Sequence, residues 1–162
     1  MRFTKWTVAL LFLTCAIASQ AATQQAATQE KEKKLKRSDL PAAVQQTVDQ
    51  ESRGATIRGY SSETEGGQLQ YEVAMTLRGH HRDVTIAADG SVVEIEEVVA
   101  LDSLPAPVRA GLLQAAGAGK ITRVESLTKR GAIVAYEAQV RTGKKRSEVQ
   151  VGPDGTPLAH PE

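Results

Sequence analysis

The residues best suited to chemistry in this chain are histidines and clustered glutamates. His80 and His81 are adjacent, and His160 lies near the end of the sequence. Imidazole nitrogens are common zinc ligands, but adjacent residues of a strand point to opposite faces of a sheet. His80 and His81 can therefore share a metal ion only where a turn bends them together. We favour solvated turn histidines and keep metal binding by this pair as the alternative.

A second group consists of carboxylates. Glu94, Glu96 and Glu97 lie in one short segment, and Glu63 and Glu65 precede them in the chain. Carboxylates bind calcium, but the Asp/Gly ligand loop that usually accompanies such a site is missing. Glu94 and Glu96 share one face of an expected strand, whereas Glu97 lies on the other face. We interpret the group as a solvated sheet face rather than a cation site.

Residue sets typical of enzymes are not recognisable. An enzyme requires a nucleophile with a base, a paired acid and base, or a metal with its ligands. No Gly-x-Ser-x-Gly elbow occurs, and the Gly-Ala-Gly-Lys sequence at 117–120 lacks the Ser/Thr of a phosphate-binding P-loop. The one cysteine, Cys15, falls in a segment expected to be removed, which excludes thiol catalysis and disulfides from the mature chain. We expect a protein that is not an enzyme and uses no cofactor.

Basic residues concentrate at two expected turns in the second half of the chain. Charged turns usually serve solubility, and docking of an acidic partner is the alternative that we retain. Tyr60 is a further candidate contact, provided that its ring faces outward. The candidate binding residues are Tyr60, Lys129, Arg130, Lys144, Lys145 and Arg146.

The N-terminus has the features of a secretory signal peptide. Arg2 and Lys5 precede an apolar stretch, and small residues follow at the spacing that signal peptidase recognises. Cleavage is expected after Ala18 or Ala21. The apolar stretch is shorter than the ~20 residues that span a bilayer. We therefore predict a signal peptide over residues 1–21, a periplasmic or secreted location, and no stable membrane insertion after cleavage.

Cleavage also changes the charge. The mature chain loses two of the 20 basic residues and none of the 19 acidic ones, so its net charge goes from +1 to −1. A nearly neutral chain has no long-range field that attracts nucleic acid. Residues 22–37 are rich in Ala, Thr, Gln and charged residues and cannot bury enough apolar surface to order themselves, which predicts a disordered linker.

From residue 38 onward, four short motifs recur in the same order at offsets of 64 or 65 residues. Recurrence at a fixed period indicates an internal repeat, here two tandem units over residues 38–100 and 101–162. A unit of about sixty residues is near the size at which a single core is marginal, so we expect the two to pack together or share a sheet. The motif pairs are Leu40-Pro41 and Leu104-Pro105, Tyr71-Glu72 and Tyr136-Glu137, residues 83–86 and 148–151, and Asp89-Gly90 and Asp154-Gly155.

Each unit is predicted to open with a helix and continue with strands. Proline suits the start of a helix, and apolar residues follow at helical spacing: Leu40, Val44, Val48 and then Leu104, Val108, Leu112. Residues 68–78 alternate between apolar and polar, as a half-buried antiparallel strand does. Asp-Gly is a strong hairpin signal.

The second unit ends in Thr-Pro-Leu where the first has a fourth strand at 92–98, and Pro157 argues against a central strand there. The predicted fold class is α+β: two tandem α-β-β-β(-β) units with an antiparallel sheet and helices packed on one face.

The Leu-Pro-x-x-Val helix opening at 40–44, the Tyr-Glu-Val strand at 71–73 and the strand ending in Asp-Gly resemble the PepSY-like, β-lactamase-inhibitor-protein-like domain family. The similarity covers residues 39–158, and the second unit departs from it at Ala138. The resemblance implies an extracytoplasmic, non-enzymatic domain, often in tandem, that restrains or binds peptidases and other secreted enzymes. It offers no catalytic residues to carry over.

Together these features predict an exported binding module, for example an inhibitor or regulator that occludes a secreted or periplasmic peptidase or other hydrolase. A periplasmic protein that senses a small ligand or a metal is the alternative.

Overall fold

The computed structural model describes residues 32–158, 160 and 162. The predicted signal peptide and residues 22–31 of the predicted linker lie outside the described residues. Two short 3-10 helices, Arg37–Asp39 and Leu101–Ser103, precede the two α-helices. The regular elements are β1 (Lys33–Leu35), α1 (Ala42–Glu51), β2 (Ala55–Glu65), β3 (Gln68–Leu77), β4 (His80–Ala87), β5 (Val92–Val98), α2 (Ala106–Ala116), β6 (Lys120–Lys129), β7 (Ala132–Thr142) and β8 (Lys145–Val151).

All eight strands belong to one antiparallel sheet in the order β1 to β8, so every strand pairs with its neighbours in the chain. The predicted α+β class with an antiparallel sheet is confirmed. Strands β5 and β6 join the two halves, with Glu94 opposite Lys129 and Val98 opposite Glu125. The expectation that the halves share a sheet is therefore confirmed.

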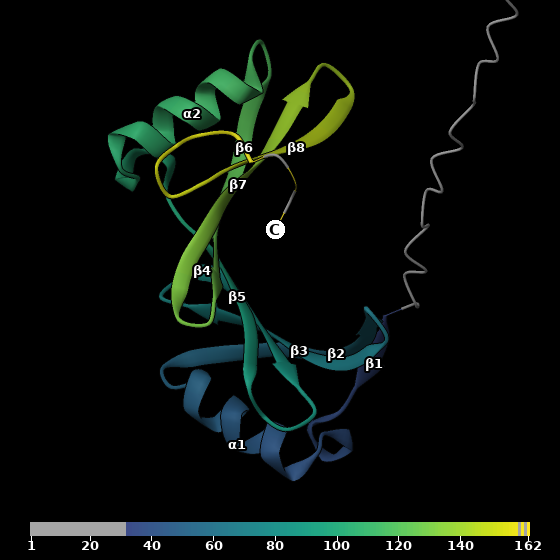
Figure 1. The fold of residues 1–162 in the computed structure, drawn as a ribbon. Coiled ribbons are helices and arrows are strands. Elements are labelled where there is room, and N and C mark those ends of the chain that lie inside the picture. The colour runs from purple at the N-terminus through teal and green to yellow at the C-terminus, as the bar shows by residue number, and fades with distance from the viewer. Residues whose placement is uncertain (1–31, 159, 161) are drawn as a thin grey trace, which may run out of the picture.

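Both helices lie on the same face of this sheet. Paired residues of antiparallel strands point to the same side. Glu97 pairs with Ser126, and the flanking residues on that side, Ile95 and Val124, contact the core clusters beneath α1 and α2 respectively. The sheet curves away from the helices (Figure 1). We call the opposite face the inner face; it carries Glu63, Gln70, Glu72, Asp83, Thr85, Glu94, Glu96, Glu125, Glu137, Gln139 and Glu148.

Each helix covers a core of its own. The predicted apolar faces of both helices are confirmed, since the six apolar residues predicted to form them, from Leu40 to Val48 and from Leu104 to Leu112, are each at most 9% exposed. The first core consists of Leu40, Val44, Val48, Val73, Met75, Val84 and Ile86. The second consists of Leu104, Val108, Leu112, Val124, Tyr136, Ala138 and Val151.

The two Asp-Gly turns lie against the helices. Asp89 accepts hydrogen bonds from the backbone N–H and hydroxyl of Ser91, and Asp154 accepts the same pair from Thr156. A Cβ on Gly90 would lie 2.9 Å from the carbonyl oxygen of Ala43 in α1. The predicted hairpin between β4 and β5 is present, and Pro157 makes only an isolated bridge to Val151.

One prediction about the start of the mature chain is wrong. Lys33–Leu35 lies within the expected disordered linker but forms β1, which pairs with β2. Leu35 packs against the first core, and the guanidinium of Arg37 donates to the Asp49 carboxylate at 2.9 Å. The edge of β2 offers unpaired backbone N–H and C=O groups with which this segment pairs, and amino-acid composition does not reveal such an edge.

The order of a helix followed by strands occurs twice. The interpretation as two copies of one unit, with boundaries at residues 38–100 and 101–162, stays a prediction. Across the described part of the chain, neither helix has the length and apolar character needed to cross a bilayer.

Candidate functional site

The six predicted binding residues do not gather into one site. Tyr60 is a candidate contact only if its ring faces outward, and that condition is not met, because it pairs with Val73 on the helix side of the sheet and packs against the first core. Lys129 and Arg130 lie at the turn between β6 and β7. Lys144, Lys145 and Arg146 lie at the other end of β7, in the turn to β8 and its start.

The histidines do not converge. His80 pairs with Leu77 and His81 with Thr76, so the two adjacent side chains point to opposite faces. His81 has its Nε2 atom 3.3 Å from Oδ2 of Asp83. Within residues 32–158, 160 and 162, no three His, Cys, Asp or Glu side chains are grouped so as to hold a metal ion.

Carboxylates line the inner face over β2 to β5. The predicted placement of Glu94 and Glu96 on one face and Glu97 on the other is correct, because Glu97 approaches Arg82 on the helix side. Asp83 lies directly opposite Glu96. Like charges facing each other across two strands destabilise a sheet. Neighbouring strands therefore hold these carboxylates together despite their repulsion.

These side chains form an acidic pocket of about 200 Å³. Glu94 and Glu96, which are predicted to lie on a solvated sheet face, are only partly exposed, and so are Glu72 and Asp83 beside them. The pocket is lined by Glu63, Glu65, Gln70, Glu72, Asp83, Thr85, Glu94, Glu96 and Glu162.

Burial changes the protonation of the pocket. It raises the pKa of Glu72 to about 7, and the negative charge of Asp83 adds to the effect. Burial also raises the pKa of Glu96 to about 7, and the charges of Glu125 and Glu94 contribute. Both carboxyls thus titrate near neutral pH, whereas an exposed glutamate does so near pH 4.3.

Burial raises the pKa of two further carboxyls on the inner face. Burial raises the pKa of Asp83, against the lowering influence of His81 and Arg123. Burial also raises the pKa of Glu125, although the guanidinium of Arg123 bonds to its carboxylate. Carboxyls with a raised pKa therefore extend from β4 across β5 to β6.

The pocket contains acceptors without a donor. Gln70 is only 8% exposed, and its Oε1 atom has no hydrogen-bond partner among the described residues. The Oδ1 atom of Asp83 is also buried and has no hydrogen-bond partner among the described residues. An unsatisfied buried polar group costs about 1–3 kcal/mol, so this arrangement lowers the stability of the free protein.

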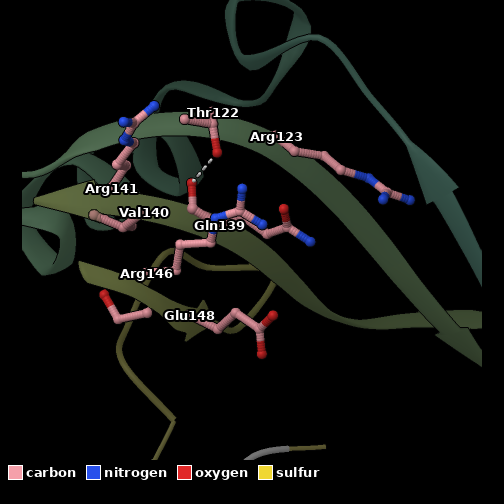
Figure 2. A pocket seen from close by; sticks show the side chains of 8 residues that line it. Thr122, Arg123, Gln139, Val140, Arg141, Arg146 and Glu148 are labelled. Atoms are coloured by element: carbon pink, nitrogen blue, oxygen red, sulfur yellow. Dashed lines mark hydrogen bonds between the residues drawn. The ribbon is translucent and has the colours of Figure 1, made fainter. Parts of the chain in front are cut away.

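A second cavity, of about 620 Å³, lies over β6 to β8, and most of the residues that line it are of polar types (Figure 2). Arg141 and Arg146 face each other across β7 and β8. The hydroxyl of Thr122 donates to the carbonyl oxygen of Gln139 at 3.1 Å. Arg123 extends away from the other two arginines in Figure 2. The inner face is thus acidic over its first half and carries arginines over its second.

Comparison with solved structures identifies the architecture. A BLIP-like protein from Bacteroides fragilis matches with a TM-score of 0.57 and 18% identity over 74% of this chain and 83% of that one. The chain has a BLIP-like fold. A proposed periplasmic protein from Bacteroides eggerthii (TM-score 0.61, 18% identity, 74% of this chain and 86% of that one) and a DUF2874 family protein from Bacteroides ovatus (0.60, 18%, 74% and 84%) have it too.

No family model matches the sequence, and no curated protein does. At 18% identity the likeness concerns the fold, so the predicted BLIP-like resemblance is confirmed at that level. The PepSY-like assignment stays a prediction.

Within the BLIP-like fold, the acidic pocket contains residues that sequence reasoning did not select. Gln70, Glu72 and Asp83 are polar residues that alternate along β3 and β4 with residues of the core. The alternation shows that these residues share the face away from the core. That face is normally open to solvent, so the alternation alone does not predict a pocket. Their clustering depends on strand pairing and sheet curvature.

Proposed function

We propose that this protein is an exported, non-catalytic module that binds a protein partner through the inner face of its sheet. The observation that carries the proposal is the acidic pocket: Asp83 opposes Glu96, and Gln70 has a buried acceptor with no donor among the described residues. Groups that cost stability in the free protein are expected at functional sites. A partner that supplies donors and positive charge offsets that cost on binding.

The partner in this proposal is a secreted or periplasmic protein, such as a peptidase or other hydrolase, which the module inhibits or regulates by steric occlusion. The fold it shares with a protein named BLIP-like supports a protein partner. The sequence features over residues 1–21 support export, with cleavage after Ala18 or Ala21. In this proposal the two units, residues 38–100 and 101–162, contribute the acidic and the arginine-bearing halves of one binding face.

Capture from periplasmic extract tests the binding face. We expect the immobilised protein to retain a defined partner that Thr85→Trp and Gln139→Trp each lose by roughly tenfold or more, because each indole fills part of the inner face. Gln46→Trp, on the exposed side of α1, is the matched control and should bind normally. Mass spectrometry identifies the partner, and an assay of its activity with and without the module tests occlusion.

Two results would contradict the proposal. Equal capture by the inner-face and control variants would place the binding surface elsewhere. Absence of a specific partner, together with no inhibition across a panel of periplasmic hydrolases, would remove the binding role itself.

A further inference from the structure

We propose that the acidic pocket receives an arginine side chain of the protein partner. This inference rests on the proposed function and states what chemistry the partner must present to the first half of the inner face.

The pocket concentrates negative charge. Glu63, Glu72, Asp83, Glu94 and Glu96 line one pocket. The one cation that the described residues place against Glu94 is Lys129, whose Nζ atom lies 3.4 Å from Oε2 of Glu94. On β4, His81 has its Nε2 atom 3.3 Å from Oδ2 of Asp83, whereas Glu72 of β3 makes no ion pair within the described residues. The acidic groups outnumber these neighbours, so the pocket attracts a further positive group.

Hydrogen bonding is the second argument. Gln70 is buried and lines the pocket, and its Oε1 atom lacks a donor within the described chain. Asp83 contributes a second buried acceptor, Oδ1. Amide and carboxylate oxygens both accept hydrogen bonds. The occupant must therefore bring several N–H groups in addition to its charge.

Geometry favours a guanidinium over a metal ion. The carboxylates are spread over four strands, β2 to β5, and neighbouring strands of a sheet lie about 4.7–4.9 Å apart. No three of the described His, Cys, Asp or Glu side chains group as metal ligands would. A guanidinium has five donors in a planar fork that can reach acceptors on neighbouring strands at once. The pocket of about 200 Å³ can hold several waters, which a guanidinium and part of its stem can replace.

The test is a titration followed by NMR of the exported form of the chain. The probe is acetyl-Gly-Arg-Gly-amide, and its matched control is the citrulline peptide, which has nearly the same shape without the charge. We expect the arginine peptide to give saturable shifts at the Gln70 side-chain amide and at the backbone amides of Glu72, Asp83 and Glu96. The citrulline peptide should produce none of them.

Variants assign the binding to this pocket. Gln70→Met keeps the side-chain length without the acceptor, and we expect it to weaken peptide binding about tenfold. Glu96→Gln should weaken it similarly. Asp102→Asn, at a carboxylate whose side chain is 96% exposed and which lies outside the pocket, should bind as the parent does. Circular dichroism establishes that each variant is folded.

Several outcomes would overturn the inference. Equal shifts from the citrulline peptide would exclude recognition of charge, and equal affinity for acetyl-Gly-Lys-Gly-amide would exclude recognition of the guanidinium fork. Displacement of the arginine peptide from the same amides by micromolar calcium chloride would identify a cation site. Partner capture lost in Gln139→Trp alongside a silent peptide titration would retain the proposed function and reject this pocket assignment.

Discussion

Gly155→Ala is expected to lower the free energy of unfolding by about 3–4 kcal/mol. Gly155 has a φ of +82°, and an added Cβ would overlap the carbonyl oxygen of Pro107 at the start of α2. The neighbour is backbone, so relief requires α2 or the Asp-Gly turn to move. Chemical denaturation monitored by circular dichroism measures the change.

Gly143→Ala is the matched control. Gly143 also has a positive φ, +62°, but no atom lies within 4 Å of a Cβ placed there. Only the backbone cost of about 1–2 kcal/mol applies at this turn. Equal losses in the two variants would show that Gly155 does not hold its turn against α2.

Stability is expected to fall as the pH rises from about 5 to 8. Folding raises the pKa of Glu72 and of Glu96 from 4.5 to about 7, chiefly through burial. Between these values the folded state binds more protons than the unfolded state, so the free energy of unfolding decreases with pH across that window and levels off above it. Because both carboxyls retain contact with solvent, we expect about 1 kcal/mol from each, well below the unscreened shift.

The variant carrying both Glu72→Gln and Glu96→Gln tests this assignment. It should match the parent protein near pH 5, exceed its free energy of unfolding by about 2 kcal/mol at pH 8, and show a flatter pH profile. Thermal or urea denaturation at several pH values gives the comparison, with Asp102→Asn as a control at an exposed carboxylate. A double variant that is less stable than the parent at pH 8 would show that these carboxylates stabilise the sheet.

Much of the fold follows from local patterns. Val44 and Val48 recur at helical spacing and are buried beneath the sheet, and the alternation in β3 places Val73 and Met75 in the core. These predictions succeed because a helix or strand exposes its periodicity in a few consecutive residues. The turn at Asp89-Gly90 was predictable for the same reason.

The failures concern partners distant in the chain. The charged composition around Lys33–Leu35 predicts a disordered linker, yet the open edge of β2 pairs with this segment. Tyr60 is a candidate contact only with its ring facing outward, but it lies opposite Val73 on the helix side, across a bulged pair of strands. Composition and spacing carry no information about which strand edge is free or where a bulge changes the register.

The sequence by itself determined the elements of this protein: two helices with apolar faces, alternating strands, and Asp-Gly turns. It also determined which residues of one strand share a face. Only the tertiary structure decided that Gln70, Asp83 and Glu96 from three strands enclose one pocket. The physical reason is that burial, a missing donor and like-charge repulsion arise between strands, after pairing and curvature have brought distant residues together.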